Sequence, residues 1–505
     1  MSAHLAIAPV LAPFVAGLAL LALAGMPPRL ERAVSVLALL AQTGIAMALL
    51  ASVAQGDILV YRLGDWPAPW GIVLVADRLA AAMVLITTLL ALFAAIHAGD
   101  GADRHGRHFH VLFQLQLFGL AGAFLTGDLF NLFVFFEVLL IASYGLLLHG
   151  GGAERTRAGL HYVVLNLLGS TVFLFAAGLL YATLGTLNLA DLALKAAALP
   201  AQDAGLARAG GLLLLAVFAL KAALLPLHLW LPAAYAGSSA PVAALFAIMT
   251  KVGAYAILRT ATLLFGDTGT ALANLFEPWL LPLALATLGI GMLGALAAES
   301  LRRLAAYLVV ASVGTLLTAF SLGAAGIAAG LYYLPHGTFA TAALFLLADA
   351  IKRRRPATVD LLRPGPDLPR HTLWGGLFFV AAIAAAGLPP LSGFLGKFLI
   401  LRAAPGQPLV WLAVLLGALT GVIALASAGS RLFLSSSTAD GAPVQQPPGA
   451  AGAPTPRELL AVGGLLGLIV ALTLGAGPAV EFAQATAAQL VAPAAYIHAV
   501  LEATP

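Results

Sequence analysis

The stretch from Asn131 to Leu148, NLFVFFEVLLIASYGLLL, decides the class of fold. It is apolar almost throughout, and its length is close to the ~20 residues that a helix needs to cross the hydrocarbon core of a bilayer. Its interior nevertheless holds a carboxylate, Glu137. A charged side chain at the centre of a membrane helix costs at least ~2.5–3.5 kcal/mol on insertion scales. The stretch therefore predicts a membrane-spanning helix and indicates a function for its carboxylate.

The composition of the whole chain favours the same class. Of the 505 residues, 61% are hydrophobic and 9% are charged, whereas soluble domains carry about 25% charged residues. Such a chain lacks the polar surface that contact with water requires, and it predicts an all-α polytopic membrane protein in a lipid bilayer. The net charge of +4 is small, and the basic residues lie in separate loops, so we expect no nucleic-acid partner.

Apolar runs of similar length recur along the chain and predict about fourteen membrane spans, with boundaries good to ~2–4 residues. The expected spans are 5–25, 33–54, 74–97, 111–127, 129–149, 160–186, 209–231, 239–264, 277–297, 303–322, 327–351, 373–401, 409–432 and 459–484. The first is expected to be a retained helix, because it lacks the positive start of a signal peptide. Two short strands are expected in the loop at 56–77, and the Pro/Gly/Ala-rich segment 438–458 predicts a linker.

The distribution of lysine and arginine predicts the orientation of the spans, because cytoplasmic loops carry an excess of these residues. One set of loops holds sixteen of the 25: Arg29, Arg32, Arg104, Arg107, Arg155, Arg157, Arg302, Arg303, Lys352, Arg353, Arg354, Arg355, Arg363, Arg370, Arg431 and Arg457. The opposite set holds six: Arg62, Arg78, Lys195, Arg208, Arg259 and Arg402. The first set is expected in the cytoplasm, which places both termini outside.

The three remaining basic residues, Lys221, Lys251 and Lys397, fall inside apolar segments, as Glu137 does. One reading is a set of structural ion pairs that hold helices together. Three lysines and one carboxylate cannot pair one to one, however. A hydrated chain of titratable groups accounts for all four, because the pKa values of buried lysine and glutamate shift readily.

Two of these lysines accompany proline breaks. FALKAALLPLHLWLP (218–232) places Pro226 five residues after Lys221, and AAAGLPPLSGFLGKFLIL (384–401) places Pro389 and Pro390 before Lys397. Proline inside a helix removes a backbone hydrogen bond. A break at membrane depth is tolerated only where protein or water satisfies the freed groups. A pair of interrupted spans indicates an inverted-repeat transporter whose path runs through the breaks.

Histidines in the chain have two readings. His336 lies inside the expected span 327–351, where it is either a hydrogen-bonded core residue or part of a proton relay, since histidine titrates near neutral pH. His105, His108 and His110 are expected to form a solvated loop without a metal.

Several kinds of chemistry have no signature in the sequence. There is no cysteine, which excludes disulfides, thiolate zinc sites and cysteine-ligated iron–sulfur clusters. No G-x-x-x-x-G-K-[ST] motif is present, so ATP bound by this chain is not expected to drive it. No cofactor is expected, and the sequence leaves open whether a metal ion binds.

Three motifs resemble one family of membrane proteins. They are GDLFNLFVFFEVLLIASYGLLL, KAALLPLHLWLPAAYAGSSAPVAALFAIMTKVGAYAILR and AGLPPLSGFLGKFLIL. They resemble the antiporter-like membrane subunits of respiratory complex I and, more closely, the D-type subunits of Mrp/Pha/Sha-type multisubunit Na⁺(K⁺)/H⁺ antiporters. The resemblance implies fourteen helices with two inverted five-helix repeats. The implied divisions are N-terminal helices in 1–110, repeats at 111–264 and 277–432, and a linker with a last helix in 433–505.

The resemblance also implies roles for the buried groups. Glu137 matches the family's acidic residue of the fifth helix, Lys221 the lysine of broken helix seven and Lys251 that of helix eight. His336 matches the histidine of helix eleven, and Lys397 the charged residue of broken helix twelve. The chain departs from several relatives at one position, because alanine (residue 340) stands where they carry a lysine.

The leading hypothesis is therefore a proton-conducting antiporter subunit in the bacterial inner membrane that exchanges Na⁺ or K⁺ for H⁺ together with other membrane subunits. Glu137 would pair with Lys221, and the proton would then pass toward His336 and Lys397. A second hypothesis couples the same channel to a redox enzyme, either complex I or a membrane hydrogenase. A third is a structural subunit in which the charges only lock helices.

Overall fold

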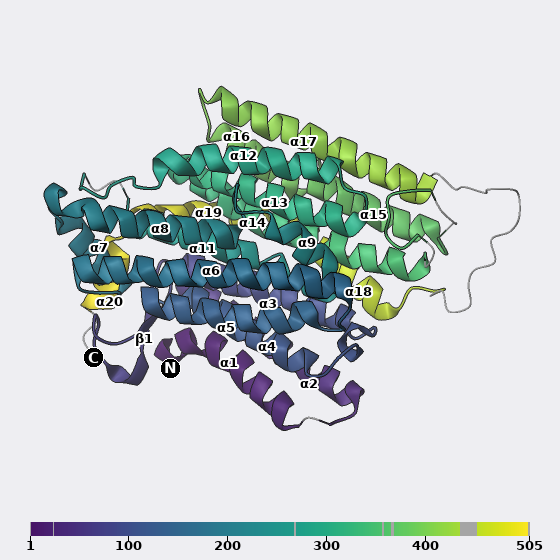
Figure 1. Cartoon of the computed structure of the whole chain (residues 1–505), viewed down its shortest axis with the longest axis horizontal. Coiled ribbons are helices and arrows are strands. Elements are labelled where there is room, and N and C mark those ends of the chain that lie inside the picture. The colour runs from purple at the N-terminus through teal and green to yellow at the C-terminus, as the bar shows by residue number, and fades with distance from the viewer. Residues whose placement is uncertain are drawn as a thin grey trace, which may run out of the picture.

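The computed structural model describes residues 2–23, 25–266, 269–355, 358–364, 368–434 and 452–502. The expected linker at 438–458 lies outside these residues as far as residue 451. The chain forms a layered bundle of long helices whose axes run in nearly the same direction (Figure 1). The first and last helices both contact strand β1, so the two ends of the chain lie at the same end of the bundle.

The structure contains these helices and strands: α1 (Ser2–Ala22), α2 (Pro28–Val53), β1 (Leu59–Arg62), β2 (Val73–Ala76), α3 (Arg78–Ala98), α4 (Phe109–Leu125), α5 (Leu129–Leu148), α6 (Ala153–Leu184), α7 (Leu189–Ala198), α8 (Ala204–Ala222), α9 (Trp230–Gly237), α10 (Ala240–Phe246), α11 (Met249–Leu263), α12 (Glu277–Leu296), α13 (Leu301–Phe320), α14 (Gly323–Arg354), α15 (His371–Ala386), α16 (Ser392–Arg402), α17 (Pro408–Gly429), α18 (Pro456–Leu474), α19 (Ala476–Val491) and α20 (Ala494–Leu501). Short 3₁₀ turns precede α3, α4 and α8, and a π-helical turn follows α17.

The expected all-α membrane fold is confirmed. Twelve spans among the described residues are long and apolar enough to cross a bilayer. The shorter apolar helices α4 and α15 lie beside them. Counting both as crossings would give about fourteen spans, a number that stays a prediction.

The most buried helices lie at the centre of the bundle. The segment that contains α10 and α11 is buried along its whole apolar window, and α13 and α14 are buried over most of theirs. The outer helices α2 and α17 instead expose rows of leucines, which suit contact with lipid. A polar side chain on a central helix is therefore solvated only where water can enter the interior of the bundle.

Two local expectations from the sequence are confirmed near the start of the chain. The two short strands expected in the loop at 56–77 are β1 and β2, and they pair antiparallel, with Leu59 opposite Ala76. Helices α4 and α5 are separate, although only three residues join them. Asp128 ends this connection and caps α5 by accepting a hydrogen bond from Asn131 N (2.8 Å).

Both expected broken spans are interrupted. Helix α8 ends at Ala222, and the next residue, Ala223, has a φ of 57°. This left-handed conformation costs a residue with a side chain roughly 1–2 kcal/mol. Helix α15 ends at Ala386, and the φ of 74° at the next residue, Gly387, suits glycine. Two further interruptions were not expected. The span 239–264 is interrupted between α10 and α11. The span 459–484 consists of two helices, α18 and α19, which meet at Gly475 and both pack against α14.

Candidate functional site

Glu137 lies near the middle of α5 and is half-buried. On its inner side, the Ser170 hydroxyl of α6 donates a hydrogen bond to Glu137 Oε1. On its outer side, Glu137 shares a face of α5 with Val134 and Ile141, whose side chains are 40% and 65% exposed. The carboxylate can therefore be reached from within this chain and from outside it.

Lys221 lies in the last turn of α8 and is buried. Its Nζ donates a hydrogen bond of 3.2 Å to Asn166 Oδ1 of α6. Asn166 and Ser170 are one turn apart on α6 and lie on one face of that helix. Glu137 and Lys221 thus each bind a neutral side chain of α6, and these two side chains lie one turn apart on that helix.

This arrangement corrects the expected direct pairing of Glu137 with Lys221. Among the described residues, no ion pair within 4.0 Å joins the two. The reason is that α6 packs against both α5 and α8 and lies between them (Figure 1). Asn166 and Ser170 were not among the residues predicted from the sequence. Their signal was two polar residues one turn apart in an apolar run.

Lys251 is fully buried in the first turn of α11, and its Nζ lies 3.4 Å from Thr250 Oγ1. Gly253 allows this part of α11 to approach the end of α8 closely. A Cβ atom at residue 253 would lie 2.4 Å from the backbone nitrogen of Ala222. The turns that carry Lys221 and Lys251 are therefore in backbone contact, and each lies beside a break in its span.

His336 is buried in α14, and both of its ring nitrogens have partners. Nε2 lies 3.0 Å from Ala384 O, and Nδ1 lies 2.9 Å from Ser392 Oγ. Because a carbonyl oxygen only accepts hydrogen bonds, Nε2 carries the hydrogen, and a neutral ring then accepts the Ser392 hydroxyl hydrogen at Nδ1. Ser392 Oγ also lies 3.4 Å from Ile469 O, so its hydrogen has a second acceptor if Nδ1 gains a proton.

Lys397 reaches the same helix end as His336. Its Nζ donates a hydrogen bond of 2.7 Å to Ala386 O, in the last turn of α15. The lysine stem packs over Gly387, where a Cβ atom would lie 2.8 Å from Lys397 Cδ. The end of α15 thus supplies backbone acceptors to His336 and Lys397, and the negative end of its dipole favours a positive charge there.

Two buried arginines of this chain differ from the buried lysines in that they are paired with carboxylates. Buried Arg259 and Asp77 form two hydrogen bonds of 2.6 and 2.8 Å, and Arg354 binds Glu458 at 2.7 Å. The three buried lysines have no carboxylate within 4.0 Å among the described residues, and their nearest polar partners are an amide oxygen, a hydroxyl and a carbonyl. A lysine held only by neutral groups can lose its proton without leaving a carboxylate unpaired.

Two expectations about charged groups were wrong. Arg259, assigned to an outer loop, lies buried in α11, because it pairs with Asp77 at the start of α3. His110, assigned to a solvated loop, is buried and bonds Asp103, which also binds Arg32. Burial alone would raise the pKa of Asp103, but the hydrogen bonds from His110 and Arg32 outweigh it and hold that pKa below its usual range.

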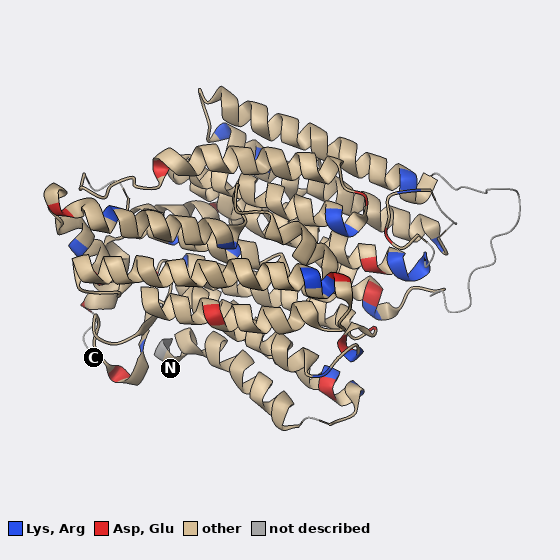
Figure 2. Ribbon diagram, in the orientation of Figure 1, with Lys and Arg blue, Asp and Glu red and all other residues tan. Residues whose placement is uncertain are grey.

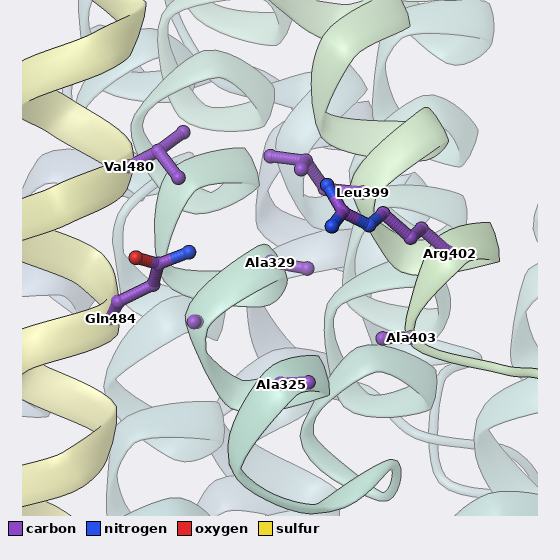
Figure 3. Close-up of a pocket in the computed structure, with 8 residues that line it drawn as sticks. Ala325, Ala329, Leu399, Arg402, Ala403, Val480 and Gln484 are labelled. Carbon is purple, nitrogen blue, oxygen red and sulfur yellow. The ribbon is translucent and has the colours of Figure 1, made fainter.

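A small cavity of about 200 Å³ lies at the C-terminal end of α16, the helix that carries Lys397. Residues of α14, α16 and α19 line it, and the Arg402 guanidinium and the Gln484 amide extend toward it (Figure 3). Arg402 follows Lys397 by five residues on α16, which is a rise of about 7.5 Å. Among the described residues, no group of three or more His, Asp and Glu is placed to hold a metal ion.

Comparisons with known proteins identify the relatives of the chain. Residues 126–424 match the family described as NADH:quinone oxidoreductase/Mrp antiporter, TM. The chain is 40% identical to the D-type subunit of a probable K(+)/H(+) antiporter of Rhizobium meliloti, over 99% of this chain and 98% of the relative. It is 37% identical to the D-type subunit of the Na(+)/H(+) antiporter of Alkalihalophilus pseudofirmus, over 99% of each chain.

Two solved structures are similar along nearly the whole chain. A chain in the structure of the Mrp complex from Dietzia is 30% identical, with a TM-score of 0.85 over 99% of both chains. A chain of respiratory complex I from Thermus thermophilus is 27% identical, with a TM-score of 0.77 over 96% of this chain and 99% of the other.

Proposed function

Because the chain belongs to the NADH:quinone oxidoreductase/Mrp antiporter membrane family, we propose that it is the proton-translocating subunit of a multisubunit cation/proton antiporter, which exchanges Na⁺ or K⁺ for H⁺. It is a transporter component rather than an enzyme. The observation that carries the proposal is the set of three buried lysines whose polar partners are all neutral. The buried arginines Arg259 and Arg354, by contrast, are each paired with a carboxylate. The lysines lack such a partner among the described residues and therefore fit a role as groups that gain and lose protons.

The proposed path starts at half-buried Glu137 and continues through the buried groups Lys221, Lys251, His336 and Lys397. Glu137 acts on Lys221 through the α6 side chains, and Lys221 exchanges its proton with Lys251 across the contact between α8 and α11. His336 and Lys397 continue the path at the end of α15. The proposed divisions are helices in 1–110, five-helix repeats at 111–264 and 277–432, and a linker with the C-terminal helices in 433–505.

The exposed face of α5 supports the proposal that other membrane subunits cover this chain. Glu137 lies on that face between side chains that suit lipid. A carboxylate in contact with lipid would carry the full cost of burial at membrane depth. A neighbouring subunit that covers α5 would remove that cost and complete the path.

Reconstitution tests the proposal. The purified chain alone in liposomes, with a pH-sensitive dye inside, should show no Na⁺- or K⁺-dependent proton movement, whereas the intact multisubunit complex should show it. The chain alone has three lysines that are proposed to carry protons, and its described residues hold no group of three or more His, Asp and Glu that could bind a metal ion. Exchange by the lone chain would place the cation site within these 505 residues. Absence of exchange by the complete complex would overturn the proposed function.

We also propose that the chain lies in the bacterial inner membrane with both termini outside. Figure 2 shows the charged residues gathered mainly toward the ends of the bundle, most densely at the end where α15 and α18 begin. That end is proposed to be cytoplasmic, because most of the loop arginines lie there.

Cysteine labelling should report this orientation. The chain has no native cysteine, so Ala453→Cys, before α18, and Gln202→Cys, before α8, introduce single exposed thiols at opposite ends. A membrane-impermeant reagent added to intact cells should label residue 202 and spare residue 453, and inverted vesicles should give the opposite result. Labelling of residue 453 in intact cells would show that the orientation is reversed.

A further inference from the structure

A polar cavity of about 490 Å³ opens at the end of the bundle that we propose to be cytoplasmic. It lies among the ends of α3, α6, α13 and α14 and the start of α10, and its lining includes Asp100, His105, Arg155, Arg302, Asp349 and Lys352. One water molecule needs only ~10–15 Å³ of such a volume together with two to four polar partners. The cavity therefore suits a cluster of water.

Asp349, in the last turns of α14, joins this cavity to the interior of the bundle. Its side chain is 19% exposed, and its Oδ2 lies 3.1 Å from Nε2 of His97, whose side chain is fully buried at the end of α3. Arg353 binds the same carboxylate at 2.6 Å. One side of the carboxylate thus faces the cavity and the other faces a histidine that the cavity does not reach.

The second ring nitrogen of His97 is available to accept a proton. Nδ1 is buried and has no hydrogen-bond partner among the described residues. Because an ionised carboxylate only accepts hydrogen bonds, Nε2 of the neutral ring carries the hydrogen, and Nδ1 is left with a bare lone pair inside the protein. An unpaired buried acceptor costs about 1–3 kcal/mol. His110, which binds Asp103, also has an unpaired buried Nδ1, but Asp103 does not line the cavity, whereas Asp349 does.

We infer that His97 and Asp349 form a proton-exchanging pair between the cavity and the interior of the bundle, an inference that rests on the proposed function. A proton that reaches Nδ1 from inside produces an imidazolium, which Asp349 stabilises. The Nε2 proton then passes to Asp349 and from there to water in the cavity. The reverse sequence carries a proton inward: water protonates Asp349, Asp349 protonates Nε2, and Nδ1 releases its proton to the interior.

Among the described residues, most of the other carboxylates near this end of α3 have partners of their own, and none of them binds His97. The charged and titratable groups on the elements around the end of α3 are Glu31 and Arg32 of α2, Asp100 and Asp103 of the following loop, His110 of α4, Lys352, Arg353 and Arg354 of α14, and Arg457 and Glu458 of α18. Helix α10 contributes none. Asp103 is held by Arg32 and His110, Glu458 by Arg354, and Asp100 by Thr455. Within the described part of the chain, Asp349 is the one carboxylate bound to His97.

The test measures exchange by the intact complex in inverted vesicles while the pH is varied separately on each side of the membrane. Asp349→Asn and His97→Gln should each lower the rate by about 100-fold, the lower end of what a positioned acid or base contributes. The residual rate should no longer respond to pH on the cavity side but should still respond on the other side. Asp191→Asn, which removes the carboxylate of an ion pair on α7, is the matched control and should keep the wild-type rate and both pH responses.

Different outcomes would contradict the proton-exchanging pair and the proposed transport function. If both variants assemble and keep both pH responses, whether at full or reduced rate, the pair has only a structural role and the inference is wrong. If the wild-type complex exchanges no cation for protons, the proposed function fails, and the inference fails with it.

Discussion

Replacing Glu137 with glutamine should reduce cation/proton exchange by about 100-fold or more, with normal insertion of the chain. Glutamine keeps the size of the side chain and can still accept the hydrogen bond from Ser170. It removes the one charge that acts on Lys221 through α6. Without that charge, no carboxylate near Lys221 in the described part of the chain helps this lysine to bind its proton and then release it. The measurement is dye-reported exchange by the intact complex in vesicles, at equal amounts of protein.

Two further variants make this result specific. Glu481→Gln removes an exposed carboxylate from α19 and should leave exchange unchanged. Asn166→Ala keeps both charges but removes the amide between them, so it should produce an intermediate loss. Wild-type exchange by the Glu137→Gln complex would contradict any coupling between the two charges.

Replacing Lys221 or Lys397 with arginine should also abolish most of the exchange, to about 1% of the wild-type rate or less. Arginine keeps the positive charge but stays protonated at any pH that the cell experiences, so it cannot pass a proton on. Both lysines are buried and contact only neutral acceptors, which an arginine could also use. The loss would therefore report the missing proton transfer rather than a missing charge.

The larger arginine side chain could also disturb packing, because the Lys397 stem packs directly over Gly387. A variant of similar volume is therefore needed as a control. Lys397→Met removes the charge with little change in volume and should be equally inactive. Lys195→Arg, on the half-exposed side chain of α7, should be fully active. Full activity of Lys397→Arg would mean that Lys397 serves as a fixed positive charge and that the relay does not pass through it.

The sequence predicted the parts of this fold that depend on local chemistry. The apolar run around Glu137 predicted helix α5, and the prolines near residues 226 and 389 predicted the breaks after α8 and α15. The two strands beside α3 followed from the turn-rich loop that contains them. Each of these features is determined by residues within about one or two helical turns.

The parts that the sequence did not predict depend on contacts between distant residues. Arg259 is buried because Asp77, 182 residues away, lies beside it in the bundle. The break between α10 and α11 has no proline or glycine to mark it. The amide of Asn166 is polar in any sequence, but its position between two charges depends on the packing of α6 against two other helices. The candidate residues were named from the sequence, and their partners were found only in three dimensions.

The shared end of α15 has a consequence for how many protons the path holds at once. His336 and Lys397 both bind carbonyl oxygens from its last turn, and such a helix end offers roughly half an elementary negative charge. That is enough to favour one cation but too little to offset two, which would repel each other strongly in a space with little water. We therefore expect the two sites to fill alternately. Protons would then cross this half of the bundle one at a time, because a proton on one site would hinder a second from binding until the first has left.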